Sequence, residues 1–288
     1  MHAFRSWWPG MQACSRVQVM HTRNPAVAGM FYPGDARRLT ATVDAFLADA
    51  RSPQRGAAKA IIAPHAGYRY SGPIAGSAYH ALLPRAESVG RVVLIGPSHH
   101  VSFPGVAVSR AAGFASPLGV LPVDRDTVEE LLKDNLVQEN DLAHAEEHSL
   151  EVHLPFLQRI FPRAALVPLL TGDGDFRSVA AVLDRVWGDR ETVVVVSSDL
   201  SHYLDYRSAC RIDRETADAI TARSAGAVGF HQACGATPIN ALLQIAGARN
   251  LSMATLDLRN SGDTAGSRDQ VVGYGAFACG FQSVSDKA

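Results

Sequence analysis

The sequence predicts an α/β fold, a single domain with a central mixed sheet flanked by helices. Short runs rich in Val, Ile and Leu alternate with amphipathic stretches of helical period, which is the pattern of a sheet covered on both faces. The chain has 288 residues, enough for one large domain or two small ones. It contains no internal repeat, low-complexity tract or linker rich in Pro, Gly and Ser, so one domain is the better interpretation.

The first predicted unit is a strand, a loop and a helix. A buried strand is predicted over residues 59–63, which are apolar after Lys59, and the loop PHAGYRYSG follows. A helix is predicted over 73–83, because Pro73 is favoured in a first turn. A second predicted strand at 91–95 ends in GPSHH, and residues 105–108 form another short apolar run.

Later segments repeat the alternation. Asp124 is placed to cap a helix over 124–134. Residues 149–161 are predicted to form one helix, because apolar residues recur at intervals of three and four from Leu150 to Phe161. The remaining predicted elements are a strand at 165–170, a helix at 176–187, a strand at 192–197, helices at 207–224 and 238–246, and strands at 252–258 and 270–281.

The composition argues against nucleic acid or membrane partners. The chain has 27 basic and 28 acidic side chains and no block of like charge, so it lacks the electrostatic footprint that either partner needs. No apolar run approaches the roughly 20 residues of a membrane-spanning helix. We therefore expect a small or neutral ligand.

Both ends of the chain are expected to lie outside the fold. We predict a disordered extension over residues 1–22, the folded domain over 23–282 and a C-terminal tail over 283–288. The extension has no continuous apolar segment of the kind that a secretory signal needs. Translation could also begin at Met11 or Met20 instead of the first Met.

The cysteines predict free thiols. Apart from Cys14, which lies in the predicted extension, Cys210, Cys234 and Cys279 are widely spaced, odd in number and show no CxxC pairing. A disulfide framework is therefore not expected, and we predict a cytoplasmic protein.

Histidines fall directly after several predicted strands. His65 follows the strand at 59–63, His99 and His100 follow the next, and Asp199 and His202 follow the strand at 192–197. In an open α/β sheet the carboxyl ends of the strands line the ligand crevice, so these side chains are expected to meet there. Two or three imidazoles with a carboxylate or thiolate form an open transition-metal site.

Two further segments contribute candidates to this pocket. Cys234 lies in the loop QACGATPIN before a predicted helix, whose N-terminus would lower the pKa of the thiol and favour the thiolate. The segment EEHSLEVHLPF brings Glu147, His148, Glu151 and His153 close together, where they could share a ligand or a proton. Alternatively, this segment is the solvent-exposed, acidic start of a helix. We predict that the segment lines the pocket. Any one of these residues alone is more often a packed residue than a ligand, and the set as a whole favours a metal site.

Six segments resemble a known family. From about Arg23 to Phe281, NPAVAGMFYPGD, IIAPHAGYRYSG, GPSHH, EEHSLEVHLPFL, VVSSDLSHY and CGATPI follow one another in the order of the Memo family, in its bacterial AmmeMemoRadiSam type. That family is similar in fold to the class III extradiol dioxygenases of the LigB type. The resemblance implies one α/β domain with a central sheet.

The resemblance also implies a set of site residues. Motif by motif, the metal ligands would be His65, His99 and Cys234. His202, with Asp199 to orient its imidazole, would be the acid/base pair, and His148 would line the pocket as a third catalytic residue. In LigB-type enzymes two histidines and a glutamate hold Fe(II); here Cys234 takes the place of the glutamate, and its softer thiolate would also suit copper or zinc.

Two classes of function remain open. One is an iron-dependent redox enzyme, such as an oxygenase, acting on a small substrate. The other is a non-catalytic protein that holds iron or copper or docks a peptide, for which Arg69 is the main arginine near the pocket. A further alternative is that these residues form a pocket that holds no ligand. The resemblance further implies a radical S-adenosylmethionine protein and an Ammecr-type protein as partners.

Overall fold

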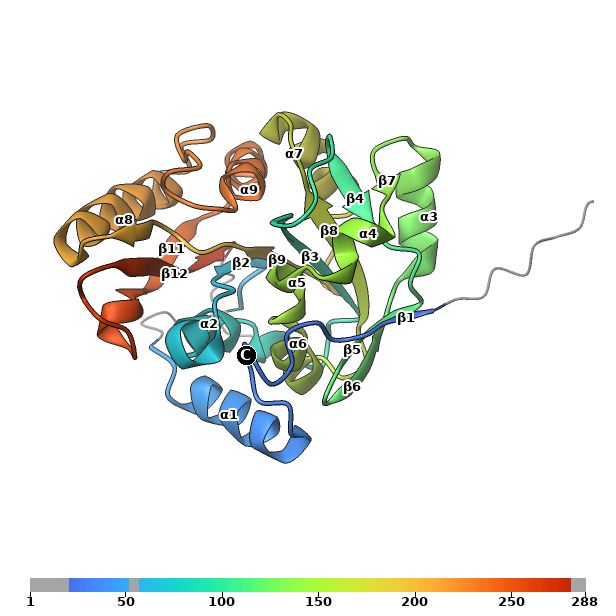
Figure 1. Ribbon diagram of the computed structural model, residues 1–288. Helices are drawn as coiled ribbons and strands as arrows, with labels where there is room; N and C mark the ends of the chain where they lie inside the picture. Colours follow the sequence, from blue (N-terminus) through green and yellow to red (C-terminus); the bar gives the residue numbers. More distant parts are fainter. Residues whose placement is uncertain (1–20, 52–56, 281–288) are drawn as a thin grey trace, which may run out of the picture.

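A mixed sheet forms the centre of the computed structural model, which describes residues 21–51 and 57–280 (Figure 1). Four parallel strands lie at its middle, in the spatial order β2 (Ala60–Ala63), β9 (Thr192–Ser197), β3 (Arg91–Pro97) and β8 (Ala165–Thr171). Their side chains are almost all buried, which explains why they are continuous apolar runs in the sequence. The predicted α/β fold with a central mixed sheet is confirmed.

Antiparallel strands and short strands extend the sheet at both sides. On the β2 side lie β12 (Val271–Cys279), β11 (Met253–Asn260) and β10 (His202–Leu204), all antiparallel to their neighbours. On the β8 side lie β4 (Val106–Val108) and β7 (Gln138–Glu139).

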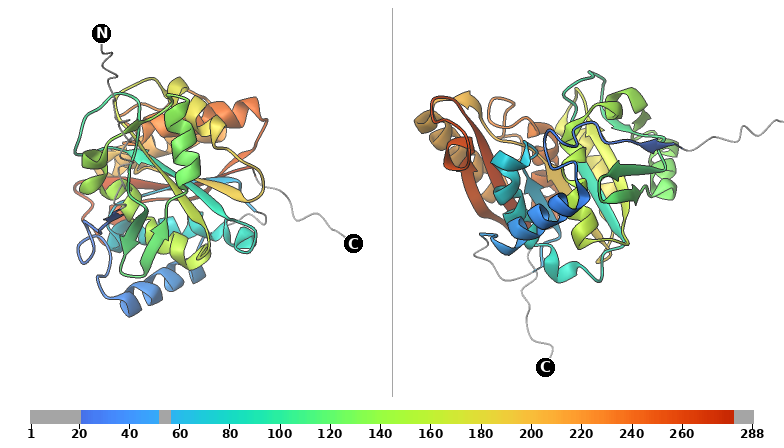
Figure 2. Two further views of the ribbon diagram at one scale, coloured as in Figure 1. Left: turned by 90° about the vertical axis from the view of Figure 1, so that its right-hand side faces the viewer. Right: turned by 60° about the horizontal axis from the view of Figure 1, so that its bottom comes forward.

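A separate small sheet joins the N-terminal segment to the domain. It contains β1 (Thr22–Arg23), β5 (Gly113–Ser116) and β6 (Gly119–Pro122), with Thr22 paired to Gly113. Figure 1 and the right-hand view of Figure 2 place it on the opposite side of the molecule from β11 and β12. Thr22, which the sequence assigned to the extension, thus begins the first strand. Residues 1–20 and 283–288, predicted as extension and tail, lie outside the described residues.

Helices cover both faces of the central sheet, and their packing is visible in Figure 1. On one side α1 packs against α2 and α6, and α2 packs on β2, β11 and β12. On the other side α7 packs against α9, and α9 on β3 and β9. The helices are α1 (Ala36–Ala48), α2 (Tyr68–His80), α3 (Arg125–Lys133), α4 (Asp141–Ala145), α5 (His148–Glu151), α6 (Leu154–Ile160), α7 (Phe176–Arg185), α8 (Tyr206–Thr221) and α9 (Ala236–Ala248), with 3-10 turns at Leu83–Arg85 and Ser261–Asp263. Within the described ranges, none of them combines the length and apolarity that a membrane crossing requires.

Two predicted helix boundaries are wrong, for identifiable reasons. Helix α2 begins at Tyr68, whose N–H donates to the Phe31 carbonyl (2.7 Å) and so satisfies one free donor of the first turn. Pro73 therefore lies inside the helix and not in its first turn. The helix predicted over 149–161 is broken into α5 and α6. Pro155 has no N–H and its ring would collide with the carbonyl four residues earlier, so it lies in the first turn of a new helix that begins at Leu154.

Candidate metal centre

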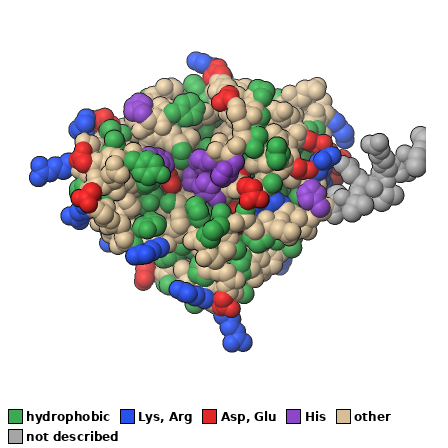
Figure 3. All heavy atoms as spheres, viewed as in Figure 1, with side chains coloured by type: hydrophobic (Ala, Val, Ile, Leu, Met, Phe, Trp, Pro, Cys, Tyr) green, Lys and Arg blue, Asp and Glu red, His purple; other side chains and the backbone are tan. Residues whose placement is uncertain are grey.

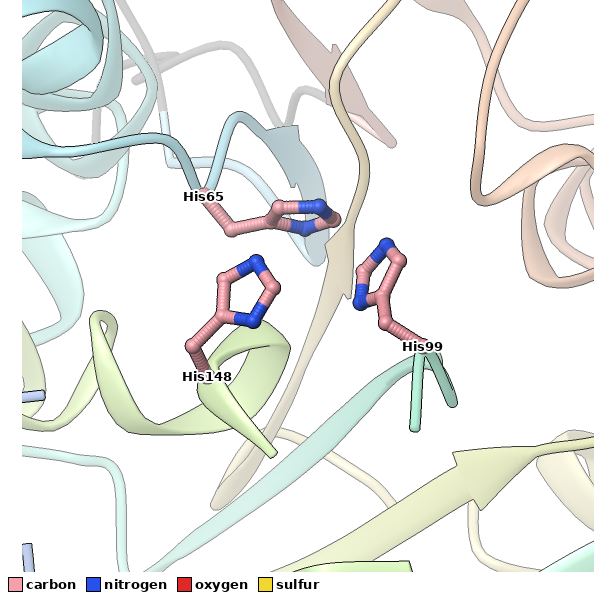
Figure 4. Close-up of side chains that lie close together, drawn as sticks. All are labelled: His65, His99 and His148. Atoms are coloured by element: carbon pink, nitrogen blue, oxygen red, sulfur yellow. The ribbon is translucent and has the colours of Figure 1, made fainter. Parts of the chain in front are cut away.

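Three histidines face one another at the carboxyl ends of the central strands (Figure 4). His65 follows β2, His99 follows β3, and His148 is the first residue of α5. One ring nitrogen from each lies within 4.8 Å of the others, and this is the triad that meets a metal-binding geometry in the described part of the chain. The prediction that His65 and His99 meet is thus confirmed in the structure, and His148, expected only to line the pocket, lies at ligand distance as well.

Parallel pairing explains the convergence of His65 and His99. Strands β2 and β3 both pair with β9 and run in the same direction, so they end at the same edge of the sheet. His65 is buried, His148 is half-buried and the His99 residue opens to solvent. The centre therefore has a closed inner side and an accessible outer side.

Glu147 is the buried group behind two of the three imidazoles. Its Oε1 accepts a hydrogen bond from His99 Nδ1 (2.9 Å) and lies 3.4 Å from His148 Nδ1. The carboxylate also accepts the backbone N–H groups of His99 and Ser149. Although burial raises the pKa of Glu147, the hydrogen bonds with His99 and Ser149 bring it down to about 2. With Nδ1 turned to this carboxylate, Nε2 is the nitrogen that remains for a metal.

His65 has the same arrangement with a neutral partner. Its Nδ1 lies 2.6 Å from Ser197 Oγ, and its Nε2 lies 3.3 Å from Cys234 Sγ. Burial, and then the neighbouring histidines, hold the pKa of His65 well below its usual value. Burial also lowers the pKa of His148 to about 4. Both rings are therefore in the neutral form that binds metals.

Cys234 lies beside the triad, at its His65 end. It precedes α9, as predicted, but the expected lowering of its thiol pKa is wrong. Burial, reinforced by the negative charge of Asp199, raises the pKa of Cys234 to about 12 and outweighs the helix N-terminus. In the protein alone the thiol is protonated; a bound cation would displace that proton.

Asp199 and His202 do not form the predicted pair in the described contacts. Asp199 Oδ1 accepts the backbone N–H groups of His65 (2.8 Å) and Ala66 (3.3 Å), because β9 and β2 are neighbours. Asp199 therefore shapes the backbone that carries His65. Burial raises the pKa of Asp199 to about 7, despite these two hydrogen bonds. His202 is half-buried, and its pKa is lowered by burial and by the charge of His99 nearby.

The backbone that leads to His202 is held by pairing with strand β12. Leu200 N–H donates to the Gly273 carbonyl and Gly273 N–H donates to the Ser201 carbonyl, both at 2.8 Å. Ser201 N–H donates to the buried Asp213 carboxylate (3.0 Å). A Cβ on residue 273 would lie 2.1 Å from Asp213 Oδ2, so this position requires glycine.

The segment from Arg23 to Tyr32 anchors the helix that carries His148. Glu151, completely buried in α5, accepts Arg23 Nη1, the Tyr32 hydroxyl (2.6 Å) and the backbone N–H groups of Ala26 (2.7 Å) and Val27 (3.0 Å). Arg23 also donates to the carbonyl of Glu147 (2.7 Å). The NPAVAGMFYPGD motif therefore has a structural role, which is to hold Glu151 and with it helix α5. This role could not be assigned from the sequence.

The opening of the centre has a cavity lined by both polar and apolar residues, with exposed hydrophobic side chains nearby. A cavity of about 490 Å³ lies beside His99 and Cys234, with Phe230 in its wall. Met30, Tyr203 and Phe230 are each more than two-thirds exposed. Met30 adjoins Phe31, whose ring lies 4.9 Å from that of His148, and Tyr203 adjoins His202. Figure 3 shows the histidines gathered in a hollow at the centre of this face with hydrophobic side chains around them.

Known proteins match almost the whole described chain. The profile of the Memo-like protein family covers residues 23–278. A MEMO1 family protein of Aquifex aeolicus is 34% identical over 268 residues, which cover 88% of this chain and 98% of the relative. One from Archaeoglobus fulgidus is 36% identical over 265 residues, covering 88% of this chain and 97% of the relative. A solved structure, the uncharacterized protein JW3007 from Escherichia coli K12, covers 75% of this chain and 98% of its own at 13% identity and a TM-score of 0.43, too distant to bear on the site. The chain belongs to the Memo-like protein family.

Proposed function

We propose that this protein holds one transition-metal ion, iron, at the histidine triad and acts as a metal-dependent redox enzyme. The observation that carries the proposal is that His65, His99 and His148 each turn Nδ1 toward a polar partner, which leaves Nε2 for a shared ion. Ligating histidines in proteins are held in this way by a second layer of hydrogen bonds. His65 and His99 are the constant pair of the proposed ligand set, completed by Cys234 or His148.

The donor set fits a borderline transition metal better than a hard cation. Neutral imidazoles and a thiol suit iron, copper and zinc, whereas magnesium and calcium require oxygen ligands. Two or three protein ligands leave positions open to a substrate. Iron bound there would supply a Lewis acid and a one-electron redox couple for a substrate that enters from the open side.

The surrounding residues have assignable tasks in such a reaction. His202 is half-buried beside the centre and neutral, so it can accept a proton from a substrate and return it. Asp199 holds the His65 backbone in place. The apolar residues Met30, Tyr203 and Phe230 would cover an apolar part of the substrate and keep water from the reacting atoms.

Metal content tests this proposal directly. The full chain is purified without oxygen from unsupplemented cells, and its metals are measured by mass spectrometry for wild type, His65→Ala and His99→Ala. His231→Ala, which removes an exposed histidine outside the triad, is the matched control. Near-stoichiometric iron in wild type and control, lost in the two triad variants, supports the proposal. Background metal in all four proteins overturns it, and stoichiometric copper or zinc overturns the choice of iron.

One observation favours peptide docking as a second candidate. Arg69 is exposed and lines a pocket of about 400 Å³ together with Met30 and Phe31. In the described part of the chain its guanidinium has no carboxylate partner and lies over the Tyr70 ring (5.8 Å). An acidic peptide that binds wild type but not Arg69→Ala would support this role, and equal binding by both would exclude the site.

A further inference from the structure

A chain of four buried side chains leads from the metal centre into the core. Ser197 Oγ, at the end of β9, lies 2.6 Å from His65 Nδ1 and 3.0 Å from His153 Nε2. His153 Nδ1 lies 3.0 Å from the hydroxyl of Tyr79 in α2. All four residues are at most 2% exposed.

The hydrogen bonds of Ser197 determine where the protons of this chain lie. Its hydroxyl has one hydrogen, and Ser149 O, 2.6 Å away, is a carbonyl that can only accept. The hydroxyl therefore donates to Ser149, and its lone pairs accept from both imidazoles. His65 then carries its proton on Nδ1, and His153 carries its own on Nε2.

The last contact fits the same assignment. With its proton on Nε2, His153 has a bare Nδ1, which accepts the Tyr79 hydroxyl. Every polar hydrogen in the chain then has an acceptor, and no buried donor is left unpaired, which is the condition for a stable buried network.

We propose that Ser197, His153 and Tyr79 are positioning residues that lock His65 in the tautomer with Nδ1 protonated, so that Nε2 always faces the metal centre. The consequence for metal binding rests on the function proposed above, whereas the tautomer itself is a property of the metal-free protein. The chain ends at the fully buried Tyr79, so it orients a ligand and does not carry protons to solvent.

The two sides of the centre are thereby made unequal. His99 donates to the buried Glu147 carboxylate, and His65 donates to a neutral hydroxyl. A carboxylate behind an imidazole raises its basicity as a ligand, and a hydroxyl does so much less. His65 is therefore fixed in direction by its network without gaining the electron donation that His99 receives.

The test reads the tautomer in metal-free protein. The full chain is labelled with ¹⁵N-histidine, and long-range ¹H–¹⁵N spectra identify the protonated nitrogen of each ring, with His65→Gln and His153→Gln for assignment. We expect Nδ1–H for His65 and Nε2–H for His153. A wild-type His65 protonated on Nε2 overturns the proposal.

Variants separate positioning from general stability. Ser197→Ala should convert His65 to a mixture of tautomers and weaken binding of Zn²⁺, used as a diamagnetic probe, by roughly 10- to 100-fold. An unchanged His65 tautomer in Ser197→Ala overturns the proposal.

A milder pair covers the case in which Ser197→Ala does not fold. Tyr79→Phe should change the His153 spectrum, whereas Tyr206→Phe should not, because the Tyr206 hydroxyl donates to Asp263 outside this chain. Identical His153 spectra in both variants overturn the proposal. If the tautomers are as expected but no protein binds Zn²⁺, the proposed function fails and the positioning chain stands.

Discussion

Removal of the Arg23 side chain should cost much of the stability of the fold. In Arg23→Ala the Glu151 carboxylate keeps its hydrogen bonds from Tyr32, Ala26 and Val27 but loses its positive partner in a site with no solvent exposure. Truncation of one partner of a buried ion pair costs about 3–5 kcal/mol, because the other charge is left uncompensated. A typical domain is stable by only about 5–15 kcal/mol, so the loss should be roughly a fifth or more of the total.

Urea unfolding followed by circular dichroism measures this loss. Arg159→Ala is the control, because Arg159 pairs with Asp44 on the surface with both side chains about two-fifths exposed or more, and such pairs contribute about 0–1 kcal/mol. A loss in Arg23→Ala that is no larger than the loss in the control would refute the view that the N-terminal segment anchors α5 through Glu151.

Three further predictions concern residues in and around the centre. Burial raises the pKa of Asp213 from 3.8 to about 6, so the folded state binds more protons than the unfolded state. The free energy of unfolding should therefore fall by on the order of 3 kcal/mol as the pH rises from about 4 to 6. In Asp213→Asn, urea unfolding across this range should lack this pH dependence. Gly273→Ala should destabilise the protein by about 1–3 kcal/mol in the same assay, because its Cβ meets Asp213, whereas Gly90→Ala, with open space around its Cβ, should not. If Cys234 binds the metal, its thiol must release a proton. The metal affinity measured by calorimetry should then rise about tenfold per pH unit from about pH 7.5 to 9, and in Cys234→Ala it should not depend on pH in this range. A wild-type affinity that does not change with pH would mean that only histidines bind the metal.

The sheet was predictable because its strands are buried on both faces. The apolar runs at 59–63, 91–95 and 192–197 became β2, β3 and β9 to within two residues, since nothing polar interrupts them. The short strands β1 and β7, of two residues each, have no sequence pattern long enough to detect. Helix α2 was misplaced because its first turn is satisfied by Phe31, a residue from another part of the chain.

The site was predictable in position but not in its hydrogen bonds. That His65 and His99 converge follows from parallel strands alone, and the sequence provides that pattern. The partner of His99 lies 48 residues away in Glu147, and the partner of His65 lies 132 residues away in Ser197. The predicted lowering of the Cys234 pKa was wrong for the same reason, because the burial of the thiol depends on neighbours that are distant in the sequence.

The hydrogen bonds around α5 fix the position of this short helix more precisely than apolar packing would. Helix α5 has four residues, too few to be stable by its own hydrogen bonds, yet it carries His148. Apolar contacts stabilise without fixing direction, whereas a carboxylate with four donors fixes both position and rotation. Glu151 does this at the last residue of the helix, and Glu147 does so at the N-cap, where it accepts the Ser149 N–H and faces His99. Because α5 begins at His148, these directional contacts determine where that imidazole lies relative to His65 and His99, to the tolerance that a shared metal ion demands.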